Sequence, residues 1–145
     1  MSEHLPSQTF DRQVLRTRLA RALAEPDYPD FLHQHAARDI ASRLELILRD
    51  FETALILADK PDDLTERMRS TGRFGQIMSA RTIAKPAVET APQIVCNEEF
   101  LPIAEQSLDC VISVLNLQLI NDLPGALVQM FRALRPDGLF LAALL

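Results

Sequence analysis

Two kinds of hydrophobic pattern divide this chain into helices and strands. Near the N-terminus, apolar residues recur every three or four positions, which predicts amphipathic helices over residues 11–25 and 30–51. From residue 53 onward, short apolar runs alternate with helical segments. Runs that are apolar almost throughout are typical of parallel strands covered on both faces. The predicted strands are residues 53–58, 74–80, 93–96, 108–114 and 139–145.

Capping and breaking residues delimit the helices between these strands. Pro61 begins a helix that runs to Ser70 and that Gly72 can stop. A second helix begins after Asp122, and the turn at residues 136–138 ends it. Residues 81–92 hold two prolines and little periodicity, so we expect a loop or a broken helix there. The inner face predicted for the second helix consists of Leu123, Leu127, Met130, Phe131 and Leu134.

This order of elements predicts an α/β fold. Two N-terminal helices precede alternating strands and helices, a pattern that produces a parallel, doubly wound sheet. The 145 residues are enough for one domain with a sizeable core. Within that domain we expect a helical cap over residues 1–52 and an α/β core over residues 53–145.

The composition of the chain argues against some classes of partner and indicates the cellular compartment. The net charge of -5 argues against a nucleic-acid-binding protein. The longest apolar runs are far too short to span a bilayer, and the N-terminus lacks the apolar core of a secretory signal. Cys96 and Cys110 fall inside predicted strands, as reduced, buried thiols do. We therefore expect a cytoplasmic protein, or one of the mitochondrial matrix if the source is eukaryotic.

Charged and metal-binding residue types give few specific signals. His33 and His35 are two residues apart on a predicted helix and point to different faces, so we expect no shared metal ion. The first helix carries four arginines, which form either a solvated face or a contact with an anion or a partner. They are Arg12, Arg16, Arg18 and Arg21.

Several segments together resemble the class I S-adenosylmethionine-dependent methyltransferases. They are Glu98–Pro102, Ser107–Asp109, Asn121–Leu127 and Arg132–Gly138, with Phe10–Arg12 near the start. The most similar branch contains the malonyl-carrier-protein methyltransferase of biotin synthesis and the mitochondrial complex I assembly methyltransferase-like proteins. The resemblance implies a Rossmann-like sheet in the order 3-2-1-4-5, with S-adenosylmethionine at the carboxyl ends of the strands. Open α/β sheets place their ligands at that edge in general.

The resemblance also implies where the cofactor contacts lie. Its amino-acid end would lie at the first predicted strand, its ribose at the second, and its adenine at the third, with the fourth strand as the floor. The corresponding residues are Ala58, Asp59 and Lys60, then Arg81, then Asn97 and Glu98, and finally Ser113 and Leu115. No catalytic residue is assigned, because methyl transfer can proceed by positioning alone.

The cofactor loop differs from the family pattern. Ala58, Lys60 and Asp62 stand where the family has glycines, and Ile56 stands where it has an acid. Asp62 and Asp63 would repel a carboxylate from the positive end of the helix that follows. We expect methyl transfer to an unassigned small-molecule or protein acceptor, with weakened cofactor binding. The alternative is a non-catalytic scaffold or partner-binding protein; a nucleotide-binding protein of another family is disfavoured because no phosphate-binding glycine motif is present.

The last predicted strand, Leu139 to Leu145, needs a cover. The family continues beyond it with a helix and two more strands, so we expect either a truncated core or another chain that covers this strand. An apolar edge strand presents unpaired backbone groups to any neighbouring chain. We therefore expect a homodimer or a heteromer that forms through this strand.

Overall fold

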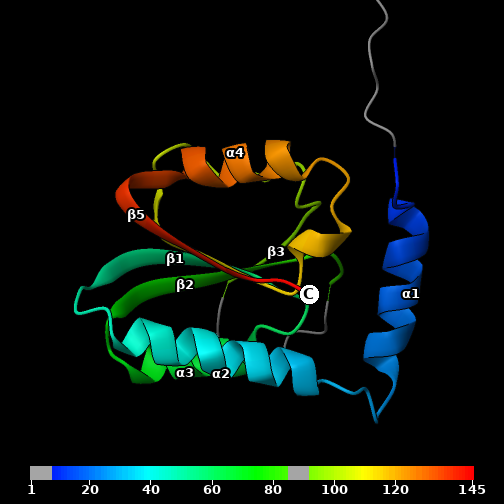
Figure 1. Cartoon of the computed structure of the whole chain (residues 1–145), viewed down its shortest axis with the longest axis horizontal. Helices are drawn as coiled ribbons and strands as arrows, with labels where there is room; N and C mark the ends of the chain where they lie inside the picture. The colour runs from blue at the N-terminus through cyan, green and yellow to red at the C-terminus, as the bar shows by residue number, and fades with distance from the viewer. Residues whose placement is uncertain (1–7, 85–91) are drawn as a thin grey trace, which may run out of the picture.

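The computed structural model describes residues 8–84 and 92–145, which form a five-stranded sheet with helices on both faces (Figure 1). Part of the loop expected over residues 81–92, namely residues 85–91, lies outside the described residues. In chain order the elements are α1 (Arg12–Ala24), α2 (Phe31–Glu45), β1 (Phe51–Leu57), α3 (Asp62–Ser70), β2 (Phe74–Arg81), β3 (Gln93–Val95), β4 (Leu108–Val114), the 3-10 turn η1 (Leu117–Leu119), α4 (Leu123–Ala133) and β5 (Leu134–Ala143).

The strands lie in the order β3-β2-β1-β4-β5, and every neighbouring pair is parallel. This confirms the predicted sheet. The central strand β1 pairs on both sides, so that Leu55 lies opposite Met78 of β2 and Val111 of β4. Because all strands are parallel, their carboxyl ends meet at one edge.

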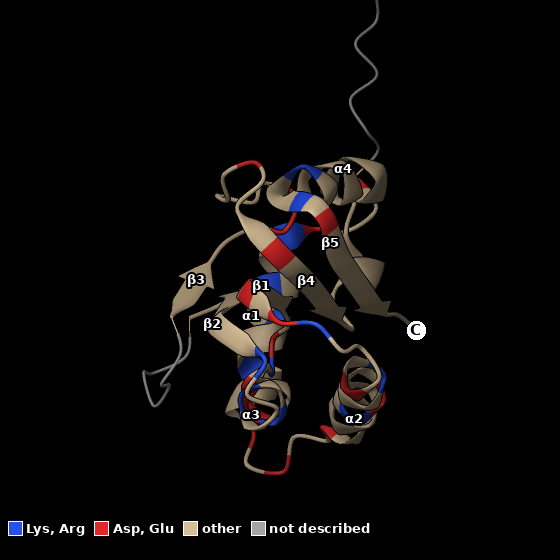
Figure 2. Ribbon diagram, turned by 90° about the vertical axis from the view of Figure 1, so that its left-hand side faces the viewer, with Lys and Arg blue, Asp and Glu red and all other residues tan. Residues whose placement is uncertain are grey.

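Two apolar layers hold the helices to the sheet. On one face, Ile56 of β1 packs in a cluster with Leu44 of α2 and Met68 of α3. On the other face, Leu55 packs in a cluster with Met130 of α4. Successive residues of a strand point to opposite faces, which is why neighbours in β1 belong to different layers. Figure 2 shows α2 and α3 on one side of the sheet and α4 on the other.

Helix α1 stands apart from these layers, across one end of the sheet (Figure 1). The carboxylate of Asp11 caps it by accepting hydrogen bonds from the backbone of Gln13 at 2.9 Å and Val14 at 3.0 Å. Leu15 and Leu19 are half-buried, and no residue of the helix is fully buried. This helix is therefore held to the protein by few contacts, in contrast to α2.

The predicted second helix is too long. Helix α2 ends at Glu45, Leu48 is 87% exposed, and Phe51 is the first residue of β1. The helical spacing of apolar residues continues by coincidence through Ile47, Leu48 and Phe51. Pairing beside Phe74 buries the Phe51 ring, stacked at 5.0 Å between centroids, and this burial outweighs one more helical turn.

The end of the chain also departs from its prediction. The predicted inner residues Leu127 and Phe131 are exposed, and Ala126, Met130 and Ala133 are the buried residues of α4. The predicted turn at residues 136–138 lies inside β5, where Leu134 pairs with Leu108 and Leu139 already pairs with Cys110. Such an insertion is a bulge, and Asp137 takes the left-handed conformation there, with φ of 65°. Strand β5 thus begins earlier than predicted and ends at Ala143.

Other predicted boundaries are confirmed. Asp122 caps α4 by accepting from the backbone of Gly125 at 2.9 Å. Gly72 follows the end of α3 with φ of 69°, a conformation that glycine adopts without strain. Cys110 is a buried free thiol inside β4, whereas Cys96 lies just beyond the end of β3 and is partly exposed.

Candidate functional site

The carboxyl ends of four strands bring polar side chains together beneath α1. Asp59 follows β1, Thr82 follows β2, Glu98 follows β3 and Asn116 follows β4. All four line one cavity of about 30 Å³, which Arg12 of α1 closes from the other side. This cavity has room for about one water molecule.

Glu98 is the centre of this cluster. Glu98 is 3% exposed, and its Oε1 accepts hydrogen bonds from Thr82 Oγ1 at 2.6 Å and from Asn116 Nδ2 at 2.9 Å. Its Oε2 forms an ion pair with the guanidinium of Arg12, which also donates to the carbonyl of Leu119 at 3.3 Å. Burial alone raises the pKa of Glu98, but these hydrogen bonds and the charge of Arg12 outweigh it and lower the pKa below 4.5. Glu98 is therefore a carboxylate near neutral pH.

A second polar cluster joins the end of β2 to the start of α3. Arg81 is 2% exposed and donates to the carbonyl of Asp59 at 3.5 Å and to the carboxylate of Asp62 at 3.2 Å. The carboxylate of Asp59 accepts from the backbone of Thr82 at 3.4 Å. Burial, together with the charge of nearby Glu98, raises the pKa of Asp59. A cationic group placed beside Asp59 would reverse this shift.

Lys60 lies at the border of two wider cavities. Its ammonium forms an ion pair with Asp30 at 3.3 Å and lies 4.6 Å from the centroid of the Tyr28 ring. On one side, a cavity of about 300 Å³ is lined by Asp59, Lys60 and Arg81 together with the α1 residues Ala20, Leu23 and Ala24. On the other, a cavity of about 320 Å³ lies between α2 and the start of α3.

The floor at the end of β4 contains polar atoms without hydrogen-bond partners. Ser113 Oγ and Asn116 Oδ1 are both buried and accept no hydrogen bond in the part of the chain that the structure describes. Most buried polar atoms in folded proteins have a partner. These two oxygens therefore mark hydrogen-bonding capacity that a bound ligand or a water molecule can use.

The predicted site residues fall into three groups. Asp59, Lys60 and Arg81 line the cavity of about 300 Å³, and Glu98 and Leu115 line the smaller one. Ala58 and Ser113 are buried at the strand ends. Asn97 is separate from them: its amide oxygen already accepts from the backbone of Glu99 at 3.0 Å.

Three residues of the site were missed by the sequence reasoning: Arg12, Thr82 and Asn116. Thr82 and Asn116 each follow a predicted strand, and that position is itself a signal for a ligand site in a parallel sheet. Arg12 was counted with the surface arginines. Helical spacing from Leu15 and Leu19 would have placed Arg12 on the same inner face of α1.

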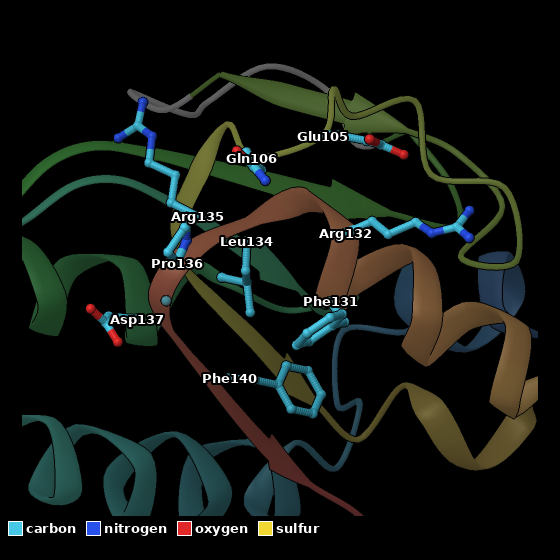
Figure 3. A pocket seen from close by; sticks show the side chains of 10 residues that line it. Glu105, Gln106, Phe131, Arg132, Leu134, Arg135, Pro136, Asp137 and Phe140 are labelled. Carbon is cyan, nitrogen blue, oxygen red and sulfur yellow. The ribbon is translucent and has the colours of Figure 1, made fainter.

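A separate cavity lies beside β5, away from the strand ends. It measures about 540 Å³, and Figure 3 shows Phe131 of α4 and Phe140 of β5 projecting into it. Phe131 is 78% exposed and Phe140 is 36% exposed. On its rim, Arg135 forms an ion pair with Asp109 at 3.0 Å. This surface is apolar at its centre and charged at its edge.

Residues 8–84 and 92–145 contain neither a candidate membrane span nor a candidate metal-binding cluster. No helix in these ranges has both the length and the apolar character needed to cross a membrane. Within the same ranges, no group of three or more histidine, cysteine, aspartate and glutamate side chains is arranged to hold a metal ion.

Sequence comparisons connect this geometry to known proteins. A family described as a methyltransferase domain matches residues 74–142. The mouse protein named "Arginine-hydroxylase NDUFAF5, mitochondrial" is 34% identical over 142 residues, covering 93% of this chain and 41% of the relative. A malonyl-[acyl-carrier protein] O-methyltransferase from Laribacter hongkongensis is 30% identical over 154 residues, covering 93% of this chain and 51% of the relative. The chain thus spans about half, or less, of the length of these relatives.

Structural comparisons agree on the fold. A chain in the complex between the Haloferax volcanii Trm112 methyltransferase activator and a methyltransferase superposes with a TM-score of 0.71 and 20% identity, covering 92% of this chain and 59% of that one. The N-methyltransferase NodS from Bradyrhizobium japonicum, solved with S-adenosyl-L-homocysteine, superposes with a TM-score of 0.67 and 15% identity, covering 86% of this chain and 70% of that one. The predicted family and fold are both confirmed.

Proposed function

We propose that this chain, which belongs to the S-adenosylmethionine-dependent methyltransferase family, binds S-adenosylmethionine at the carboxyl ends of β1, β2 and β4 and supports methyl transfer. The observation that carries the proposal is the cavity of about 300 Å³ lined by Asp59, Lys60 and Arg81. Its volume lies at the lower limit for small-molecule sites, which is about 300 Å³. The cavity is also at the edge where parallel sheets bind ligands.

The charges around this cavity suit the amino-acid end of the cofactor. That end carries an ammonium and a carboxylate. The carboxylate of Asp59 can accept from the ammonium, and the cations of Lys60 and Arg81 can attract the carboxylate. The buried Oδ1 of Asn116, a residue that lines the cavity of about 30 Å³, offers an acceptor for donor groups further along the ligand. The chemical character of these residues therefore fits the cofactor.

Other features make binding weak. Pro61 removes a backbone donor from the loop, and Asp62 and Asp63 occupy the first turn of α3, where they repel a ligand carboxylate. With α1 in place, the space in front of Glu98 is only about 30 Å³, too small for a nucleoside. We therefore propose that α1 has to move before the whole cofactor can bind.

When bound, the cofactor supplies the transferable methyl group, and the protein's part is to place the acceptor in line with it. The relatives are named for arginine hydroxylation and for O-methylation of a malonyl carrier protein. The second name gives an acceptor held on a carrier protein, so we propose an acceptor carried on a protein rather than a free metabolite.

The test is calorimetric titration with S-adenosylmethionine and S-adenosylhomocysteine. We expect dissociation constants between about 10 μM and about 1 mM. Asp59→Asn should weaken binding, and Glu105→Gln, which changes an exposed carboxylate away from the cleft, should leave it unchanged. Absence of heat at about millimolar ligand, with the protein folded, would contradict the proposal.

A second candidate function is partner binding without catalysis. It is favoured by the surface around Phe131 and Phe140 and by β5, whose only partner among the described strands is β4. We propose that a second copy of the chain, or another protein, pairs along residues 139–145. Light scattering of the native protein tests this: a dimer that Phe140→Asp dissociates supports it, and a strict monomer contradicts the homodimer.

The compartment and the domain division also remain proposals. We propose a reducing compartment, cytoplasmic or, in a eukaryote, the mitochondrial matrix. The support is the pair of free thiols and the mitochondrial names of the mouse, rat and human relatives. The division into a cap over residues 1–52 and a core over residues 53–145 stays a prediction.

A further inference from the structure

Helix α1 is fastened over the strand ends by two sets of polar contacts near its N-terminus. The first is the buried ion pair between Arg12 and Glu98, with the additional bond from Arg12 to the carbonyl of Leu119. The second is a reciprocal pair of hydrogen bonds with Asn121. The backbone N–H of Phe10 donates to Asn121 Oδ1 at 2.7 Å, and Asn121 Nδ2 donates to the carbonyl of Phe10 at 3.0 Å.

The rest of α1 contributes little to holding it. None of its residues is fully buried, and only a few of its apolar side chains are even half-buried. The aliphatic residues of α1 that line the small cavity are Leu15 and Leu19. An isolated helix of 13 residues is only marginally stable in water, so its position depends on these polar contacts.

We infer that α1 is a latched cover which competes with the cofactor, with Arg12 filling the half of the cleft that the nucleoside needs. The inference rests on the proposed cofactor site and adds its regulation. Arg12 satisfies a buried carboxylate at the place where the ligand should lie. Any group that replaces it has to bring hydrogen-bond donors to Glu98, as the amino and hydroxyl groups of adenosine do.

The unused capacity of the pocket supports this role for Arg12. Asn116 lines the small cavity, and its Nδ2 donates to Glu98, yet its Oδ1 has no partner among the described residues. A helix that served only to fill this space would satisfy this atom, because an unpaired buried oxygen costs free energy. Arg12 therefore occupies the pocket without completing it.

A latch of this kind sets the apparent affinity of the cofactor. If the cleft binds ligand only when α1 is open, the apparent dissociation constant is the intrinsic value divided by the open fraction. Weakening the latch should raise the open fraction and tighten binding. In return, bound cofactor should hold α1 away from Glu98.

The test uses three variants of the full chain. Arg12→Ala removes the ion pair, Asn121→Ala removes the second contact, and Arg16→Ala changes an exposed arginine of the same helix as the control. Opening is measured directly, without any ligand, as hydrogen–deuterium exchange of the amides of residues 12–24. The amides of β4 serve as the internal reference, since their protection shows that the sheet stays folded. Affinity is measured separately by calorimetry with S-adenosylhomocysteine.

We expect faster exchange in α1 for Arg12→Ala and Asn121→Ala, with the control and the β4 amides unchanged. S-adenosylhomocysteine should bind Arg12→Ala about tenfold more tightly for a tenfold rise in the open fraction, and should accelerate α1 exchange in the native protein. Unchanged exchange in both variants would overturn the latch. Faster exchange with unaltered or weaker affinity would overturn the competition. If the ligand binds none of the proteins, the proposed cofactor site and the competition both fail, while the exchange data still decide whether the latch exists.

Discussion

Replacing Glu98 by glutamine removes one charge from the centre of the site with little change in shape. Thr82 and Asn116 both donate to the same oxygen of Glu98, so the glutamine oxygen will keep that place. Its amide NH₂ group then faces Arg12. A donor will thus face a donor where the native protein has an ion pair.

The size of the effect follows from what is lost. A hydrogen bond to a charged group contributes about 1.5–3 kcal/mol, and Arg12 retains some access to water. We therefore expect the free energy of unfolding to fall by about 2 kcal/mol near pH 7. Domains of this size unfold with about 5–15 kcal/mol, so the loss is measurable by urea denaturation followed by circular dichroism.

The difference between the two proteins should depend on pH. The pKa of Glu98 is held below 4.5 in the folded protein, because its hydrogen bonds and Arg12 outweigh the effect of burial. The stabilisation is then fully present above pH 4.5 and is lost as the pH falls through the lower, folded-state pKa. Below that value the protonated native side chain resembles glutamine, and the two unfolding free energies should converge.

The control is Glu105→Gln, which removes an exposed carboxylate and should follow the native protein at every pH. A difference between native and Glu98→Gln proteins that stays constant from about pH 3 to about pH 7 would refute the assigned charge state. Equal stability near pH 7 would refute the ion pair itself.

Three further predictions test the packing, the capping and the thiols. Met130 is 1% exposed and Phe131 is 78% exposed, so in urea denaturation Met130→Ala should lower the free energy of unfolding by about 2–5 kcal/mol and Phe131→Ala by less than about 0.5 kcal/mol. Comparable losses for the two variants would mean that the predicted inner face of α4, which includes both residues, was right. Asp122→Ala should lower the free energy of unfolding by about 1 kcal/mol through loss of the α4 cap, whereas Asp122→Asn should keep most of the stabilisation that the cap provides. Equal losses in the two variants would show that the cap hydrogen bond is not the cause. Burial raises the pKa of Cys96 to about 11 and that of Cys110 to about 12. Iodoacetamide near pH 8 should therefore label the native thiols about 100-fold more slowly than the urea-unfolded ones. Fast labelling of the native protein would contradict the burial of the thiols.

The parallel sheet was predictable from properties that the chain displays locally, whereas the order of its strands was implied by the family resemblance. Apolar runs such as residues 53–58 and 108–114 can be satisfied only inside a covered sheet. The ends of the helices and strands were less predictable where a local pattern fits residues that belong to another element. Residues 47, 48 and 51 continue a helical spacing, but the pairing of Phe51 with Phe74 involves a strand that lies far along the chain. At β5, the Pro-Asp-Gly sequence is a turn by composition and a bulge in the structure, since β4 pairs with residues on both sides of it.

The candidate site shows the same limit at the level of side chains. The family resemblance implied the places of Asp59 and Glu98, which lie after strand ends, where parallel sheets bind ligands. Helical spacing indicates that Arg12 lies on the inner face of α1, but its partner Glu98 is distant in sequence and does not follow from that spacing. Only the docking of α1 across the strand ends distinguishes Arg12 from Arg16.

The departures from the family pattern become consistent with one another once the contacts are known. Asp62 stands where the family has a glycine, and its carboxylate would repel that of the cofactor. Here Arg81 donates to Asp62 at 3.2 Å, so this departure from the family pattern has a partner within the protein. In the same way, Glu98 would be a costly buried charge without a ligand, and Arg12 supplies the missing partner. Under the proposed latch, the chain's own cations stabilise the closed form of the cleft, and the affinity for a cofactor depends on how readily those cations are displaced.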